Sequence, residues 1–170
     1  MLGFLFRRLT AAPERGSELF DAVTKIAREP HWYVEGKVPD TIDGRFAVLA
    51  TITALVLVRL ERDERPGDLV SVALTERFIE VMESEHRELG LGDPTLGRTV
   101  RKLVRRLAVQ VEQWRSAVNE KRSWTAAAEE SLYEAGATAD AVAHSASALK
   151  RLWDKLRKLG LSDIEQGKLG

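Results

Sequence analysis

The 170-residue sequence contains no cysteine and only three histidines. The absence of cysteine excludes disulfide bonds, thiol catalysis and thiolate metal sites, and it fits a reducing compartment. The sequence also has no histidine cluster for zinc, no glycine-rich phosphate loop and no Ser-His-Asp arrangement in a suggestive context. We therefore predict a protein that is not an enzyme and that needs no metal or other cofactor.

The sequence also has no net charge, because 26 Lys and Arg residues balance 26 Asp and Glu residues. A balanced chain has no overall field that attracts nucleic acid or acidic lipid, so we expect no DNA partner, and any electrostatic partner must recognise a local patch. With 44% hydrophobic and 31% charged residues, the composition is typical of a soluble globular protein of one domain. We find no strand-like alternation, no internal repeat and no export signal.

The longest apolar stretch runs from Asp40 to Leu60 and contains no acidic residue after Asp43. Its apolar residues recur in steps of three and four, which predicts a helix covered by several neighbours. Asp40 or Thr41 would cap the start of this helix. Arg59 closes the run before it reaches the about 20 apolar residues of a membrane span. The main stripe consists of Ile42, Phe46, Leu49, Thr53, Val56 and Leu60.

Similar patterns, separated by proline and glycine, predict further helices over about 17–28, 69–89, 94–118, 124–135 and 138–159, with a charged turn over 61–68. The expected fold is therefore all-α, a single-domain bundle of about six helices with a central antiparallel hairpin. We divide the chain into an N-terminal extension (1–16), a helical domain (17–160) and a frayed tail (161–170).

Residues 1–12 have an apolar side with two basic residues beside it. One interpretation is a short helix docked on the bundle, and the other is an anchor in a membrane interface. Pro13 ends the segment in either case. The apolar side consists of Leu2, Leu5, Phe6 and Leu9, and the basic residues are Arg7 and Arg8.

The two central helices would each span about 33 Å and are joined by a short turn. An antiparallel hairpin would place the start of the first helix beside the end of the second. Aromatic residues of the preceding loop either plug the core or anchor a partner at the same place. The candidate client- or partner-binding residues are Trp32, Tyr33, Asp40, Asp43, Arg45, Phe46, Arg87, Glu88 and Asp93. The alternative is that the charged residues only cap helix ends and pair with one another.

Basic residues follow one face of the helix predicted after Asp93, at i, i+3, i+4 and i+7 with one more beside them. Such a face is either ordinary solvated surface or a binding surface for anionic lipid or ribosomal RNA. The residues are Arg98, Arg101, Lys102, Arg105 and Arg106.

Glu83 and His86 place a carboxylate and an imidazole at i and i+3, as in one half of a di-iron carboxylate bundle. A complete site needs a second such pair and two further inward carboxylates. Neither His31 nor His144 supplies that pair, so the favoured interpretation of these residues is a solvated helix face.

Two segments resemble the ubiquinol-cytochrome c chaperone family. They are Val38-Pro39-Asp40-Thr41-Ile42-Asp43-Gly44-Arg45-Phe46, and Arg87-Glu88-Leu89-Gly90-Leu91-Gly92-Asp93 followed by Gly97-Arg98-Thr99-Val100-Arg101-Lys102. The similarity covers about residues 17 to 120. Because the chain is compact and has no presequence, it is more similar to an alphaproteobacterial member than to a mitochondrial one.

The resemblance implies an all-helical assembly chaperone that binds newly made cytochrome b, or a related respiratory subunit, during assembly of complex III. It implies a cytoplasmic protein, and it leaves open a contact with the inner membrane, the ribosome or a small partner protein. The main alternative is a peripheral lipid- or ribosome-associated helical protein without a dedicated client. A di-iron carboxylate enzyme is a weaker alternative.

Overall fold

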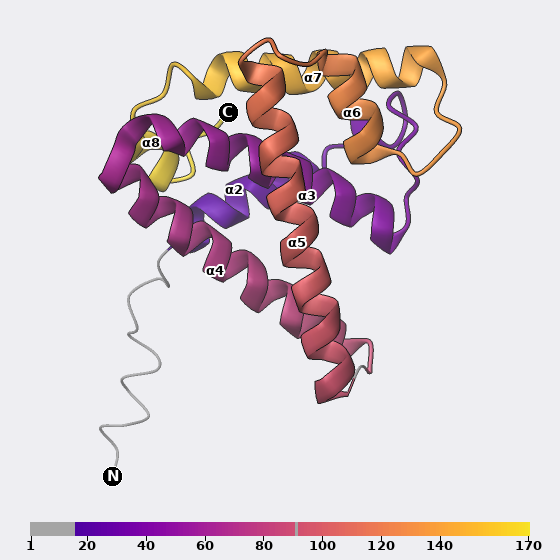
Figure 1. Cartoon of the computed structure of the whole chain (residues 1–170), viewed down its shortest axis with the longest axis vertical. Coiled ribbons are helices and arrows are strands. Elements are labelled where there is room, and N and C mark those ends of the chain that lie inside the picture. Colours follow the sequence, from indigo (N-terminus) through magenta and orange to yellow (C-terminus); the bar gives the residue numbers. More distant parts are fainter. Residues whose placement is uncertain (1–15, 91) are drawn as a thin grey trace.

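The computed structural model describes residues 16–90 and 92–170, so the helix expected within residues 1–12 lies outside the described residues. Every regular element in the described residues is helical, which confirms the all-α prediction (Figure 1). The α-helices are α2 (Ser17–Ala27), α3 (Ile42–Leu60), α4 (Glu64–Glu88), α5 (Asp93–Val118), α6 (Trp124–Leu132), α7 (Ala139–Leu156) and α8 (Leu161–Glu165). Two short 3-10 helices are η1 (Pro30–Trp32) and η2 (Glu61–Asp63).

Helix α3 forms the centre of the bundle, and α2, α5, α6 and α7 pack around it (Figure 1). Thr41 caps this helix as the sequence predicts, because its Oγ1 accepts a 3.1 Å hydrogen bond from the Gly44 N–H. From Phe46 to Leu60 every residue is buried except Leu49 and Leu57, which are partly exposed. The apolar surface of α3 is therefore covered by other helices. Among the described residues, no helix combines the length and hydropathy of a membrane span.

Helices α3 and α4 run in opposite directions from the turn at η2, but they diverge and form a V, with α5 crossing α3 (Figure 1). Phe46 of α3 lies beside Phe78 of α4, with ring centroids 6.0 Å apart. Because α4 has 25 residues and α3 has 19, the end of α4 extends past the start of α3. The predicted meeting of residues 40–46 with residues 87–93 is therefore wrong, and residues 87–90 and 92–93 lie at the tip of an arm made by α4 and α5 (Figure 1).

The tail over residues 161–170, which the sequence predicts to be frayed, is folded. Leu161–Glu165 form α8, and Ile164 and Leu169 are buried. Gly167 has a φ of +70°, and a Cβ added there would lie 2.5 Å from the Glu18 carbonyl oxygen of α2. The tail can approach α2 this closely because glycine has no side chain and tolerates this backbone conformation.

Candidate functional site

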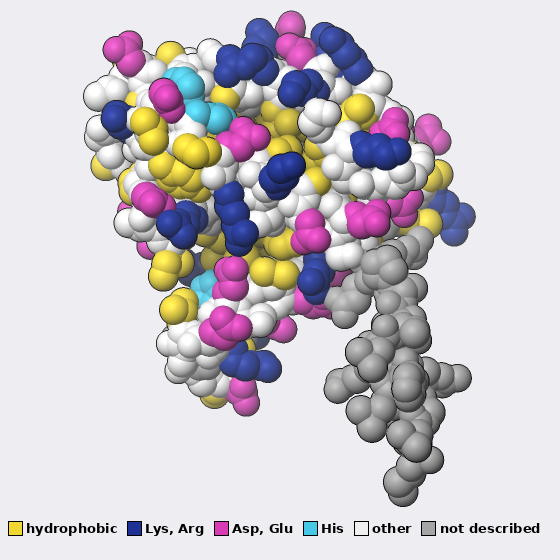
Figure 2. All heavy atoms as spheres, turned by 180° about the vertical axis from the view of Figure 1, so that it is seen from behind, with side chains coloured by type: hydrophobic (Ala, Val, Ile, Leu, Met, Phe, Trp, Pro, Cys, Tyr) yellow, Lys and Arg dark blue, Asp and Glu magenta, His cyan; other side chains and the backbone are white. Residues whose placement is uncertain are grey.

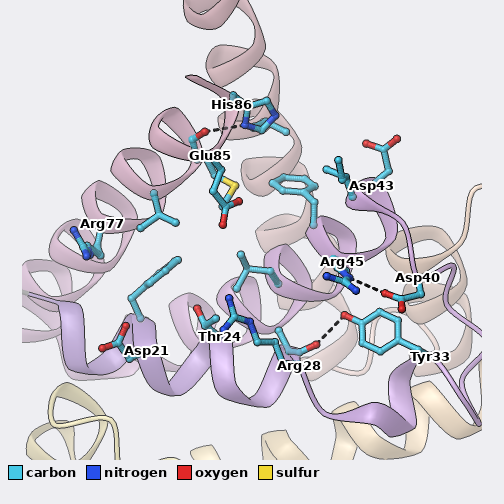
Figure 3. A pocket seen from close by; sticks show the side chains of 18 of the residues that line it. Asp21, Thr24, Arg28, Tyr33, Asp40, Asp43, Arg45, Arg77, Glu85 and His86 are labelled. Carbon is cyan, nitrogen blue, oxygen red and sulfur yellow. Dashed lines mark hydrogen bonds and ion pairs between the residues drawn. The ribbon is translucent and has the colours of Figure 1, made fainter. Parts of the chain in front are cut away.

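A groove of about 850 Å³ lies between α2, the start of α3 and the second half of α4 (Figure 3). It results from the divergence of α3 and α4, because helices that splay apart leave apolar surface uncovered between them. The loop after α2 lines one end of the groove, and Leu103 of α5 contributes from the arm. Figure 2, which views the molecule from the side opposite to Figure 1, shows hydrophobic side chains exposed between charged ones.

The groove combines an apolar lining with a charged rim. Its apolar side chains come from four helices and include Phe20, Ala27, Phe46, Leu49, Val81, Met82 and Leu103. Its charged and titratable residues are Asp21, Arg28, Tyr33, Asp40, Asp43, Arg45, Arg77, Glu85 and His86. Pockets with apolar walls and a few polar groups are typical ligand- and peptide-binding sites, so this groove is the candidate functional site.

Two apolar residues of the groove are well exposed. Val34, in the loop, is 57% exposed, and Ile42, at the start of α3, is 63% exposed. The sequence places Ile42 on the buried stripe of the helix, and this prediction is wrong because α4 has already diverged from α3 at that point. Exposed apolar side chains next to an apolar groove mark a surface that another molecule can cover.

The end of the groove that is lined by the loop after α2 depends on two close backbone contacts. A Cβ added to Gly44 would lie 1.8 Å from the Pro39 carbonyl oxygen, so only glycine lets the loop fold back onto the first turn of α3. Gly36 is buried in the same loop, and its carbonyl oxygen accepts a 2.5 Å hydrogen bond from the Tyr133 hydroxyl. These contacts hold residues 33–46 in one arrangement on the rim.

Asp40 and Arg45 form an ion pair on this rim, with 2.6 Å between Oδ1 and Nε (Figure 3). The hydrogen bond from Arg45 lowers the pKa of the Asp40 carboxyl group, and the same bond raises the pKa of Arg45. Tyr33 lies beside the pair and donates a 2.9 Å hydrogen bond to the Ala27 carbonyl. Burial raises the pKa of the Tyr33 phenol, although the nearby Arg45 charge opposes this effect. The rim therefore carries paired charges at neutral pH.

The α4 wall carries Met82, Glu85 and His86 (Figure 3). The Nδ1–H of His86 donates a 2.8 Å hydrogen bond to the Met82 carbonyl, so its ring is held against its own helix. Glu83 is exposed and does not line the groove. Within residues 16–90 and 92–170, no group of three His, Asp or Glu side chains is placed to hold a metal ion.

The structure gives Trp32 a different role from the predicted docking role. Its side chain is 1% exposed, and its indole N–H donates a 2.8 Å hydrogen bond to the Ile26 carbonyl. A buried indole with a satisfied N–H is a core residue, so it cannot contact a partner in this conformation. Its neighbour Tyr33 instead reaches the groove.

The structure brings together five of the predicted client-binding residues in the lining of the groove, namely Tyr33, Asp40, Asp43, Arg45 and Phe46. Of the four others, Trp32 is buried, and Arg87, Glu88 and Asp93 are exposed at the tip of the arm and do not line the groove. The α2 and α4 walls of the groove, which include Arg28, Arg77 and Met82, were not predicted from the sequence. No local pattern could have revealed them, because their meeting depends on how α2 packs on α4.

The basic face of α5 is only partly as predicted. Arg98, Arg101, Lys102 and Arg105 are exposed along this helix. Arg106 is partly buried and its guanidinium carbon lies 5.1 Å from the centre of the Phe46 ring. This cation–π contact directs Arg106 towards α3. The prediction that Arg106 belongs to the face that binds an anionic surface is therefore wrong.

Comparison of the sequence with models of known protein families shows which family the chain belongs to. The sequence model of the ubiquinol-cytochrome C chaperone family matches residues 34–169. The chain belongs to this family. The resemblance of residues 38–46 and 87–102 is therefore confirmed, and the match continues through α6, α7 and α8. Family membership supports a chaperone role in the assembly of respiratory complex III and points to a non-enzymatic assembly factor.

A solved structure shows the same fold. The crystal structure of a Cbp3 homolog from Brucella abortus superposes with a TM-score of 0.78 over 98% of this chain and 94% of that chain. The two sequences are 23% identical, so this similarity supports the fold and not a shared binding site. No curated protein sequence gives a significant match.

Proposed function

We propose that the protein is a chaperone that binds newly made cytochrome b, or a related respiratory subunit, during assembly of complex III. Family membership supports the general role, and the groove supplies a place where a membrane subunit can bind before it is inserted. The observation that carries the proposal is the exposure of Val34 and Ile42 beside the buried apolar lining.

The chemistry of the groove fits a short apolar or amphipathic helix of the client. Segments of a membrane subunit expose apolar side chains to water before insertion, and covering them is favourable by about 25 cal/mol per Å². Phe46, Leu49 and Met82 would contact the apolar side of such a helix, while the rim would contact its polar side. The Asp40–Arg45 pair would help to set the orientation of the client, because opposite charges occupy fixed positions there.

The basic face of α5 supports a second part of the proposal. Four exposed cations on one helix form a local positive surface on a chain with no net charge. This surface would hold the chaperone near anionic lipid of the inner membrane or near ribosomal RNA, where the client is made. We therefore propose a cytoplasmic protein with peripheral contact to such a surface. A protein with this contact but no dedicated client is the competing function.

The test measures recovery of cytochrome b with the tagged chaperone and the level of complex III in cells. Ile42→Asp and Val34→Asp place charges at the groove without disturbing buried residues. Val72→Asp and Leu69→Asp are matched controls, because these residues of α4 are 54% and 53% exposed and do not line the groove. We expect the groove variants to lose cytochrome b and complex III selectively and the control variants to retain both.

The rim is tested separately with Arg45→Ala. This residue is exposed, so we expect the fold to be retained and cytochrome b recovery to fall. If Arg45→Ala and Ile42→Asp both leave client recovery unchanged, the groove does not bind the client. If deletion of the gene leaves all respiratory complexes at normal levels, the chaperone proposal itself fails.

A further inference from the structure

One end of the groove lies close to the place where α2 begins. Gly16 has a φ of +83°, and its backbone packs so closely on α4 that an added Cβ would lie 2.8 Å from the Ala73 carbonyl group. Asp21 lies five residues after Gly16 on α2, and Arg77 lies four residues after Ala73 on α4; both line the groove. Each is therefore about 6–8 Å along its helix from the contact between Gly16 and Ala73. The chain that precedes Gly16 therefore starts beside this end of the groove.

The sequence before Gly16 has the length and pattern that the groove can accept. Leu2, Leu5, Phe6 and Leu9 recur at i, i+3, i+4 and i+7, which would place them on one side of a helix of about 12 Å. Along α2, the groove extends from Phe20 to Arg28, which is about 12 Å. The two lengths agree.

The connection also has a suitable length. Six residues, 10–15, would join such a helix to Gly16, within the range of loops that connect antiparallel helices. Pro13 prevents a continuous helix into α2. The left-handed conformation of Gly16 gives the backbone a sharp change of direction at the start of α2. A chain reversal at this point would lay the preceding residues along α2.

The charges are compatible with this arrangement. Arg7 and Arg8 lie outside the apolar stripe, and the rim offers the carboxylates of Asp21, Asp43 and Glu85. A membrane interface is a weaker occupant for the stripe, because four apolar side chains on one short helix bury little area in lipid. In contrast, a tethered segment reaches an effective concentration of the order of millimolar at the groove.

We propose that residues 2–9 form an amphipathic helix that folds back along α2 and occupies the groove until the client displaces it. The segment is then an intramolecular substitute for the client, which covers Val34 and Ile42 while the chaperone is empty. The displacement rests on the proposed function of the groove, whereas the docking does not. If the segment is bound about nine-tenths of the time, its loss raises the apparent affinity for the client about tenfold.

The absence of cysteine makes the full chain suitable for site-specific spin labelling. One label at Phe4→Cys lies opposite the apolar stripe, and a second at Ser84→Cys lies on the exposed side of α4 next to Glu85. The reference pair combines Phe4→Cys with Ser147→Cys, an exposed residue of α7. Double electron–electron resonance then measures both distance distributions without any client.

We expect a narrow distribution for both pairs, with the label at residue 4 closer to residue 84 than to residue 147. Leu5→Asp combined with Phe6→Asp should broaden both distributions. The proposal is overturned if both distributions are broad and unchanged by these substitutions, or if residue 147 is the closer site. It is also overturned if singly labelled chains couple to one another, or if ordering requires vesicles of phosphatidylglycerol and phosphatidylethanolamine.

The two proposals can fail independently. Loss of docking in the spin-label experiment, together with loss of cytochrome b in Ile42→Asp, would leave the chaperone function intact and remove only the intramolecular occupant. Narrow distances together with normal client recovery in Ile42→Asp would retain the docked segment and remove the client from the groove.

Discussion

The guanidinium group of Arg59, in α3, donates a 2.6 Å hydrogen bond from Nη2 to the carbonyl oxygen of Leu159, one hundred residues later in the chain. Its Nε donates a second bond, of 3.0 Å, to the carbonyl of Leu156 at the end of α7, and Asp63 accepts a third. The residue is 6% exposed. A single buried cation thus satisfies carbonyl groups that the end of a helix leaves without intrahelical partners.

We expect Arg59→Met to lower the free energy of unfolding by about 2–4 kcal/mol, because it leaves buried carbonyls and the Asp63 carboxylate without their donor. Urea unfolding followed by circular dichroism measures the change. Arg65→Met is the control, since Arg65 is exposed at the start of α4, and its effect should stay within about 0.5 kcal/mol. Equal stability of the two variants would show that the Arg59 contacts contribute nothing.

Substitution by alanine at two helical glycines should change the free energy of unfolding in opposite directions. Gly44→Ala brings a Cβ to 1.8 Å from the Pro39 carbonyl oxygen, so we expect a loss of about 2 kcal/mol or more and a disordered groove end. Gly97→Ala meets only the Arg101 side chain at 3.8 Å in α5, and we expect a gain of about 0.5–1 kcal/mol. Thermal unfolding compares the two variants directly, and a stabilised Gly44→Ala would contradict the tight contact.

Tyr133 makes the stability of the fold sensitive to alkaline pH. Its hydroxyl lies within hydrogen-bond distance of the Gly36 carbonyl and the Ser145 hydroxyl, and burial raises its pKa from the ordinary value of 10.0. A raised pKa in the folded state means that the stabilisation is complete below pH 10.0 and is lost as the pH rises through the folded value. Tyr33, whose pKa is also raised, contributes in the same direction.

We therefore expect the free energy of unfolding to fall steeply above pH 10.0 in the unchanged protein and less steeply in Tyr133→Phe. At neutral pH the same variant should lose about 1 kcal/mol from the missing hydrogen bond. The double variant Tyr33→Phe with Tyr133→Phe removes both tyrosines of the chain, so only other groups can then account for the slope. An unchanged slope in the double variant would refute the assignment.

The basic face of α5 predicts binding to anionic surfaces that weakens with salt. Replacing Arg98, Arg101, Lys102 and Arg105 by glutamine should weaken binding to ribosomes or anionic vesicles. It should also make the salt dependence shallower, with the negative slope of the logarithm of the binding constant against the logarithm of salt concentration reduced in magnitude by about 3. The control replaces Lys150, Arg151, Lys155 and Lys158, exposed residues at the end of α7. Equal effects of the two sets would mean that α5 has no special role and that any positive surface suffices.

Much of the fold could be predicted from local patterns. The stripe from Phe46 to Leu60 predicted α3, and the Thr41 cap was predicted because it depends on residues within one helical turn. Residues 87–90 and 92–93 at the tip of the arm and the start of α3 were each recognised, but whether the two segments lie side by side is not a local property. It depended on the relative lengths of α3 and α4, and α4 is six residues longer than α3.

The sequence by itself determined the helical class, the cap of α3 and the family, since each depends on periodicity or on residues close together in the chain. Only the tertiary structure decided which apolar residues are covered. Trp32 is buried and Ile42 is exposed, although both are large and apolar, because burial depends on which helices lie opposite. The divergence of α4 from α3 uncovers Ile42 and, by the same geometry, opens the groove.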